Sequence, residues 1–154
     1  MNTRKIIIEV ICLILMLHFF YEGVYKIAYW QNYAYWMKHA PLLKPVWQIF
    51  TYAIPVGEIL LALSFLKPSF RVNALYISIA VLMVFVFWIM CGNLFTHRLF
   101  WPYHALYEKS TWMQKMLISI GLCWLAFAAV VLLKRHSIKG IASNSLRNEP
   151  VSAH

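Results

Sequence analysis

The sequence predicts an all-α, polytopic membrane protein built as a four-transmembrane-helix bundle. Of its 154 residues, 62% are hydrophobic and only 12% are charged, a composition outside the range of ordinary soluble domains. The apolar residues fall into four runs, each near the roughly 20 residues that a bilayer-spanning helix needs. Prolines and polar or charged clusters separate these runs.

The chain is strongly basic, with a formal net charge of +9 from 14 basic and 5 acidic residues. In a soluble protein this excess would suggest a nucleic acid partner. Here most basic residues lie at the ends of apolar runs, where they meet lipid headgroups. We therefore expect the lipid bilayer as a partner, and not nucleic acid.

The first predicted span covers residues 6–25 and follows Arg4 and Lys5. A basic start before an apolar run is also typical of a signal peptide. This run is longer, and it ends in Tyr21-Glu22-Gly23 instead of a small-residue cleavage site. We expect an uncleaved first helix.

The two longer connections, after the first and third spans, are rich in aromatic residues. Residues 29–36 contain three tyrosines and two tryptophans, and residues 100–112 contain a second such group. Tyrosine and tryptophan prefer the membrane–water boundary. The sequence leaves two interpretations open: an aromatic belt at that boundary, or an aromatic lid over a pocket that opens outward.

The second predicted span covers residues 46–66 and carries Glu58 near its middle. A carboxylate at that depth costs roughly 2.5–3.5 kcal/mol on insertion scales, and such residues usually face a protein interior and belong to a site. Pro55 removes one intrahelical hydrogen bond and bends the helix. Gly57 is expected to allow close approach of a neighbouring helix.

The remaining spans are predicted at residues 72–95 and 113–133. The short link at residues 67–71 makes the second and third spans antiparallel neighbours. Residues 1–133 thus form one membrane domain, and the polar segment 134–154 is expected to be a flexible cytosolic tail.

Basic residues set the predicted topology. With an even number of spans both termini share one side, which holds eight basic residues against five on the other side. This bias favours both termini in the cytoplasm. We expect the protein to be integral to the inner membrane of the cell. Lys26 is left out of the count because it falls within the first span or at its edge.

Polar residues inside the spans are the candidates for a site. His18, Glu22 and Lys26 are spaced by four and share one face of the first helix, in an order that favours a Glu22–Lys26 ion pair. At about 1.5 Å per residue, His18 is expected near mid-bilayer, where it would meet Glu58 if the first two helices pack together. The alternative for Glu22 and Lys26 is that both lie near the outer end of the span, so that the Lys26 side chain only extends to the membrane–water interface.

Other chemistry finds little support. Cys12, Cys91 and Cys123 all lie in apolar runs without a C-x-x-C pair, which argues against a disulfide framework and a zinc site. Haem is not expected, because His18 is the one histidine inside a predicted span. The chain lacks aspartate and nucleotide-binding motifs, and no catalytic residue or metal ligand is assigned.

Two short motifs resemble a known family. Gly23-x-x-Lys26 closes the first helix, Pro55-x-x-Glu58 lies in the second, and Arg71 opens the third. This pattern resembles the DoxX-like membrane proteins, and among them the methylamine-utilisation MauE branch, over residues 6–133. The candidate pocket residues are His18, Glu22, Lys26, Glu58 and Arg71, with structural roles for Gly23, Pro55 and Gly57.

The resemblance implies a redox-associated accessory or maturation factor, with a periplasmic or membrane redox protein as partner and a quinone as a candidate cofactor. The chain departs from a thiol oxidase because its cysteines are unpaired. An accessory protein would not itself be an enzyme. Two alternatives stay open: a small proton-coupled multidrug-type transporter, often a homo-oligomer, and a structural membrane subunit without its own chemistry.

Overall fold

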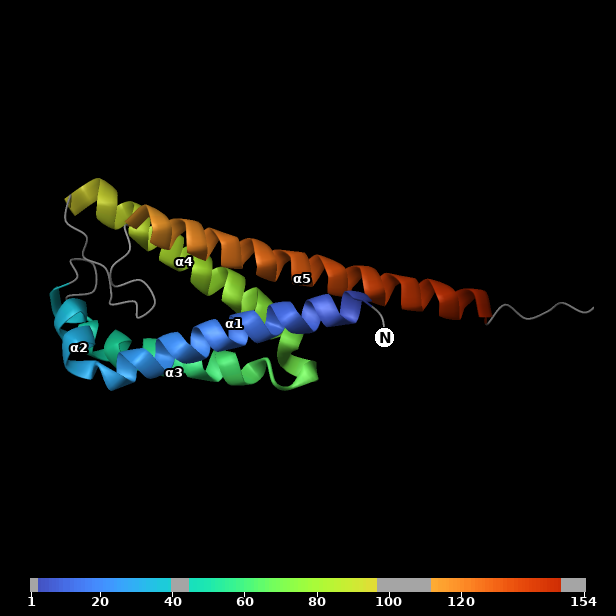
Figure 1. Ribbon diagram of the computed structural model, residues 1–154, viewed down its shortest axis with the longest axis horizontal. Helices are drawn as coiled ribbons and strands as arrows, with labels where there is room; N and C mark the ends of the chain where they lie inside the picture. The colour runs from blue at the N-terminus through green and yellow to red at the C-terminus, as the bar shows by residue number, and fades with distance from the viewer. Residues whose placement is uncertain (1–2, 40–44, 97–111, 148–154) are drawn as a thin grey trace, which may run out of the picture.

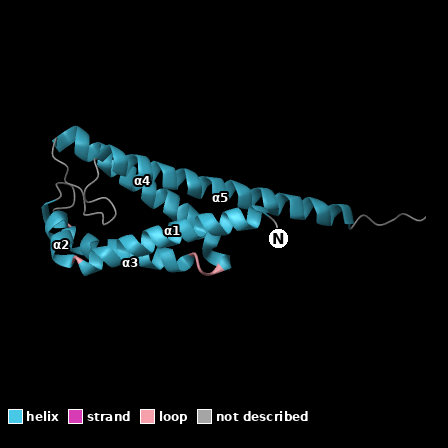
Figure 2. Cartoon of the chain, in the orientation of Figure 1, coloured by secondary structure: helices cyan, strands magenta, loops and turns pink. Residues whose placement is uncertain are grey.

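The computed structural model describes residues 3–39, 45–96 and 112–147, and the regular structure in these ranges is helical (Figure 1 and Figure 2). The elements in chain order are α1 (Thr3–Ala28), α2 (Trp30–His39), α3 (Trp47–Ser64), the 3₁₀ helix η1 (Pro68–Phe70), α4 (Arg71–Thr96) and α5 (Trp112–Arg147).

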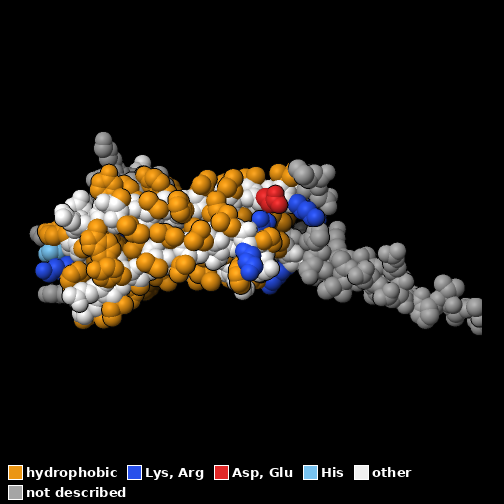
Figure 3. All heavy atoms as spheres, turned by 90° about the horizontal axis from the view of Figure 1, so that it is seen from below, with side chains coloured by type: hydrophobic (Ala, Val, Ile, Leu, Met, Phe, Trp, Pro, Cys, Tyr) orange, Lys and Arg blue, Asp and Glu red, His pale blue; other side chains and the backbone are white. Residues whose placement is uncertain are grey.

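Four of the described helices are long and apolar enough to cross a membrane. The candidate spans are Thr3–Ala28, Trp47–Ser64, Pro68–Cys91 and Met116–Lys134. These segments coincide with the four predicted spans, so the predicted fold class is confirmed. Figure 3 shows apolar side chains over the long middle of the molecule, with basic side chains near both of its ends.

The helices associate as two pairs. Figure 1 shows α1 beside α3, and α4 beside α5, with the two pairs diverging toward the end that carries α2. Helix α1 also packs against α5, whereas α3 and α4 meet over a shorter stretch. The apolar core lies where the pairs converge, and it includes Leu15, Leu61, Leu75 and Ala126.

Helix α1 buries one continuous stripe. Its buried residues recur at helical spacing and are Ile8, Ile11, Cys12, Leu15, Phe19, Glu22, Gly23 and Lys26. Spacings of three and four residues place them on one face. The stripe is apolar for most of its length and becomes charged over its last two turns.

Helix α3 turns a matching stripe toward α1, formed by Thr51, Pro55, Glu58 and Leu61. Pro55 has no backbone N–H, so the carbonyl of Thr51 loses its helical donor. The hydroxyl of Thr51 in turn donates to the carbonyl oxygen of Trp47 at 2.6 Å. The proline and its surroundings lie inside the span, next to the charged end of the α1 stripe.

Two elements differ from expectation. The first aromatic connection contains α2, which buries Tyr33 and Met37 and packs on α3. These two side chains are four residues apart and so share one face. Helix α5 continues to Arg147, so residues 134–147 of the expected flexible tail are helical. The second aromatic connection and residues 148–154 lie outside the described residues.

Candidate functional site: a buried charge triad

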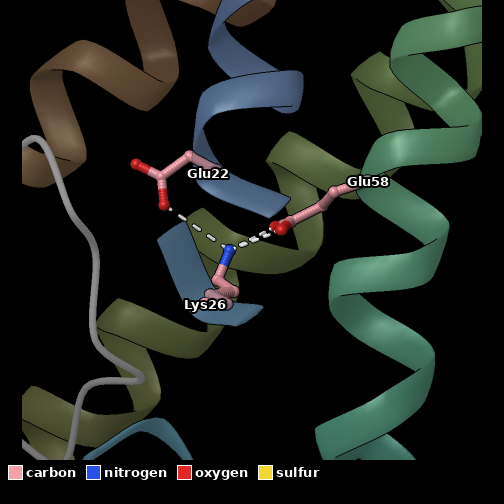
Figure 4. A network of polar contacts seen from close by, with 3 residues as sticks. All are labelled: Glu22, Lys26 and Glu58. Carbon is pink, nitrogen blue, oxygen red and sulfur yellow. Dashed lines mark hydrogen bonds and ion pairs between the residues drawn. The ribbon is translucent and has the colours of Figure 1, made fainter. Parts of the chain in front are cut away.

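Three charged side chains meet between α1 and α3, as Figure 4 shows. Lys26 Nζ donates to Glu58 Oε1 at 2.5 Å and to Glu58 Oε2 at 2.6 Å. The same ammonium lies 3.5 Å from Glu22 Oε2. We call Glu22, Lys26 and Glu58 the triad.

The triad is shielded from solvent and lies at depth. Glu22 and Lys26 are each 1% exposed, and Glu58 is 4% exposed. Glu58 lies 11 residues after Trp47 and 6 before Ser64, roughly 16 Å and 9 Å along the helix axis. The charges are therefore inside a spanning segment, where ionised groups are costly unless they are paired.

The local sequence explains how the triad assembles. Glu22 and Lys26 are one helical turn apart on the buried face of α1. Gly23 lies between them, where a Cβ atom would come within 2.8 Å of Ile59 Cγ1 and 3.0 Å of the Pro55 carbonyl oxygen. Only a glycine lets α3 approach this closely, and the approach brings Glu58 within reach of Lys26.

The charges within the triad do not balance. When all three groups are ionised, two carboxylates face one ammonium, which leaves one negative charge in excess. Coulomb interactions are strong where water is excluded. Within the triad, both carboxylates therefore attract the Lys26 ammonium strongly.

Tyr33 of α2 lies close to this charge. Its side chain is fully buried, and its hydroxyl has no hydrogen-bond partner among the described residues. Burial and, to a smaller extent, the charge of Glu58 raise the pKa of the Tyr33 hydroxyl. From the sequence, Tyr33 is placed only in an aromatic connection. Its four-residue spacing from Met37 was the signal that it belongs to a packed helix face.

An apolar cavity of about 430 Å³ adjoins the triad between α3 and α4. Glu58 is its one ionisable lining residue among the described part of the chain. The apolar walls include Phe50, Leu61, Ile77 and Phe85. Phe85 also lies against the triad, because Lys26 Nζ is 5.9 Å from the centre of its ring. Phe85 and the apolar walls were not predicted, because they depend on how α4 lies against α3.

Two of the predicted pocket residues take other places. Glu58 meets Lys26 instead of His18, which lies two turns earlier on α1 and is in edge contact with Phe19. Arg71 lies beyond the C-terminal end of α3, where its Nε donates to the Phe65 carbonyl oxygen at 3.1 Å. Its guanidinium is 3.9 Å from the exposed Glu9 carboxylate. Arg71 closes the α3–α4 turn and does not line the cavity.

The residues expected to have structural roles, Gly23, Pro55 and Gly57, differ in what they contact. Pro55 is buried beside Gly23. Gly57 does not provide close approach of a helix, because a Cβ atom there would meet nothing within 4 Å. It faces the cavity instead. The interpretation of Lys26 as a residue that extends to the interface is wrong, since its ammonium is buried between two carboxylates.

The cysteines lie apart from the triad and are all free: Cys12, Cys91 and Cys123. Among the residues that the structure describes, no three His, Cys, Asp or Glu side chains gather as metal ligands would. The charged groups of the triad pair with one another, and the cavity beside them is apolar apart from Glu58.

The comparison with family models adds an identification. Residues 4–100 match the model described as methylamine utilisation protein MauE. This match covers more than half of the chain.

The chain belongs to the MauE family. The match includes α1 to α4, and with them the triad and both walls of the cavity, whereas α5 lies beyond it. No curated protein and no solved structure matches the chain. This MauE family member is therefore a multi-pass membrane protein whose matched region contains a buried charge triad.

Proposed function

We propose that this MauE family protein is an accessory factor of the inner membrane that assists maturation of a redox protein, with the triad as its functional centre. The observation that carries the proposal is the triad itself, a set of paired charges inside a spanning segment. Intramembrane ionisable residues that face a protein interior commonly mark sites of function.

An accessory role fits the chemistry of the chain better than thiol chemistry of its own. The three cysteines are unpaired, and Cys12 is buried in the apolar core. Thiol exchange requires an accessible thiolate and usually a second cysteine nearby. The redox chemistry would then belong to the partner protein, and the family name points to a partner in methylamine utilisation.

The proposal is tested by replacing Glu58 in the source organism. Glu58→Gln keeps the shape of the side chain but removes its charge. We expect this variant to accumulate in the membrane at the normal level and to support growth on methylamine no better than a deletion strain. Glu9→Gln is the matched control, because Glu9 is 65% exposed and outside the triad.

Normal growth of the Glu58→Gln strain would overturn the assignment of the triad as functional centre. The partner is identified separately, by gentle affinity purification from membranes of the same organism followed by mass spectrometry. A co-purifying redox or thiol–disulfide protein supports the accessory role.

A proton-coupled transporter is the second candidate, favoured by two membrane-embedded carboxylates beside a cavity. It predicts proton release when a transported compound is added to the purified protein, and loss of that release in Glu58→Gln. A purified homo-oligomer without a redox partner would favour this candidate.

A further inference from the structure

We propose that the short link between α3 and α4 binds the headgroup of an anionic phospholipid, with Arg71 and Lys67 as the residues that contact its phosphate. The lipid belongs to the leaflet that this end of the bundle faces. Neither residue is part of the triad, so the inference stands apart from the proposed function.

Positive charge gathers at the end of the bundle where α1 begins. Figure 3 shows basic side chains clustered at this end, beside an acidic side chain. The described basic residues of this end are Arg4, Lys5, Lys67, Arg71 and Lys134, and Glu9 is the one acidic residue described there. A surplus of basic side chains next to a membrane attracts anionic lipids.

These basic side chains lie where the spans meet the lipid headgroups. Two candidate spans begin at Thr3 and Pro68, and another ends at Lys134. Long basic side chains at the ends of spans reach the level of the headgroups. The phosphate of a lipid is the anion that is concentrated at this level, and its acyl chains can cover the exposed side chains of Leu66 and Phe70. The position therefore favours a lipid over a soluble anion.

Arg71 is held in an orientation that suits a phosphate. Its Nε donates to the Phe65 carbonyl oxygen at 3.1 Å, which fixes the guanidinium beside the link. Its Nη1 lies 3.9 Å from Glu9 Oε1, farther than a hydrogen bond reaches, and the side chain is 29% exposed. The guanidinium edge can therefore donate to two oxygens of one phosphate, which is the pairing that distinguishes arginine from lysine.

Lys67 supplies a second cation from the same link. It directly precedes η1, and Arg71 directly follows η1. The backbone N–H of Phe70 donates to the carbonyl oxygen of Lys67 at 2.9 Å, so the chain between the two basic residues forms a tight turn. Lys67 is exposed, and its ammonium lies 5.0 Å from the centre of the Phe70 ring. The link thus offers one oriented guanidinium and one flexible ammonium to the same headgroup.

The experiment measures lipid binding to the full-length protein by native mass spectrometry. The protein in non-ionic detergent is titrated with dioleoyl phosphatidylglycerol or dioleoyl phosphatidylcholine, which share their chains and phosphate but differ in net charge. We expect the first phosphatidylglycerol to bind with a Kd about tenfold lower than that of phosphatidylcholine. Soluble glycerol 3-phosphate, which lacks acyl chains, should not displace it.

Three substitutions of single charges locate the site. Arg71→Gln and Lys67→Gln should each weaken phosphatidylglycerol binding about fivefold, because each removes one of the two cations. Lys38→Gln is the matched control, since it removes the same charge from an exposed lysine of α2, at the opposite end of the bundle. If Arg71→Gln does not fold, Lys67→Gln still decides the question, because its side chain is exposed.

Arg71→Lys separates an oriented site from a diffuse attraction. This variant keeps the positive charge but loses the paired donors of the guanidinium. We expect phosphatidylglycerol binding to weaken about threefold in Arg71→Lys. A diffuse electrostatic attraction would leave binding at the level of the unmodified protein.

Five results would overturn the inference: equal affinity for the two lipids, normal phosphatidylglycerol binding in Lys67→Gln, unchanged binding in Arg71→Lys, an equal loss in Lys38→Gln, or displacement by glycerol 3-phosphate. The last result would assign the link to a soluble phosphate compound. None of these readouts involves Glu58 or growth on methylamine, so the lipid site and the proposed function can fail independently.

Discussion

Lys26 joins two helices through a single ammonium group. It contacts Glu22 within α1 and both carboxylate oxygens of Glu58 on α3. Desolvating two ions costs energy that their attraction does not always recover. The triad therefore contributes little net stability, and its main effect is to fix how α1 and α3 pack together. Removal of one charged partner costs far more stability than the intact ion pairs contribute.

Replacement of Lys26 by methionine tests this asymmetry. Lys26→Met leaves two carboxylates buried without their shared cation, and we expect a loss of about 3–5 kcal/mol of stability, as is found when one partner of a buried pair is removed. Reversible unfolding in mixed micelles, followed by tryptophan fluorescence, measures the change.

The double variant Lys26→Met/Glu58→Leu should recover more than half of that loss, because it also removes the buried charge of Glu58. Lys67→Met is the control, since Lys67 is exposed and lies only over the Phe70 ring. A loss of stability in Lys26→Met no larger than in Lys67→Met would contradict the assignment of Lys26 as a buried ion-pair partner.

A second prediction concerns the two glycines beside the triad. Gly23→Ala places a methyl group 2.8 Å from Ile59 and 3.0 Å from a backbone oxygen, and overpacking of this kind costs about 1–3 kcal/mol. Gly57→Ala adds the same methyl group into open space and should raise stability by about 0.5–1 kcal/mol, because alanine is favoured over glycine inside a helix. The same micelle unfolding measurement compares them, and equal effects would disprove close approach at Gly23.

The members of the triad and the Glu22–Lys26 pair could be predicted from the sequence, but the partner of Glu58 could not. Spacing along a helix identifies neighbours such as Glu22 and Lys26, because they follow from helical geometry alone. The partner of Glu58 depends on the axial register of α1 against α3. Gly23 sets that register by lying level with Pro55 and Ile59, and this places Lys26 at Glu58, with His18 further along α1.

At the scale of elements, α2 packs on the α1–α3 pair at the end where this pair diverges from the α4–α5 pair. The backbone N–H of Tyr29 donates to the carbonyl oxygen of Tyr25, and the backbone N–H of Tyr33 donates to that of Tyr29. Helical hydrogen bonds therefore continue on both sides of Tyr29, the residue that joins α1 to α2. The Trp30 ring lies 4.6 Å from the Tyr52 ring of α3. These contacts hold Tyr33 over the region of the triad.

The packing of α2 predicts its local stability. Met37→Ala removes a fully buried side chain and should cost about 2–5 kcal/mol of packing. Hydrogen exchange should then become at least tenfold faster in the amides of α2, with little change in α1. Tyr35→Ala is the control, because Tyr35 is 60% exposed. Unchanged exchange in Met37→Ala would show that α2 does not depend on this contact.

The spanning helices could be predicted from hydropathy, whereas helix α2 and the C-terminal extension of α5 could not. Hydropathy reports which segments prefer lipid, and it located all four spans. It says little about helices that lie at the boundary, such as α2, or about the continuation of α5 to Arg147 beyond its apolar run. Residues 134–147 are polar, yet the helix extends through them.

At the scale of the whole molecule, different elements lie at the two ends of the bundle. The link at residues 65–70 and the start of α1 lie at one end, and α2 lies at the other (Figure 1). If both termini are cytoplasmic, as the basic residues indicate, then α2 and the nearby triad lie toward the periplasm.

Cysteine labelling of intact cells tests this orientation. In a chain with its native cysteines replaced by serine, Tyr35→Cys should react with a membrane-impermeant maleimide from outside the cytoplasm. Ser69→Cys, in the opposite link, should react only after the inner membrane is opened. The reverse pattern would place the termini in the periplasm and the triad toward the cytoplasm.

The position of the triad on two separate helices has a consequence for biosynthesis. Helix α1 leaves the ribosome first and carries Glu22 and Lys26 one turn apart, so it enters the bilayer with its charges already neutralising each other. Glu58 follows on α3 without a basic residue in its own helix. Its insertion is favoured because the ammonium of Lys26, synthesised earlier, is already in the bilayer and can pair with it.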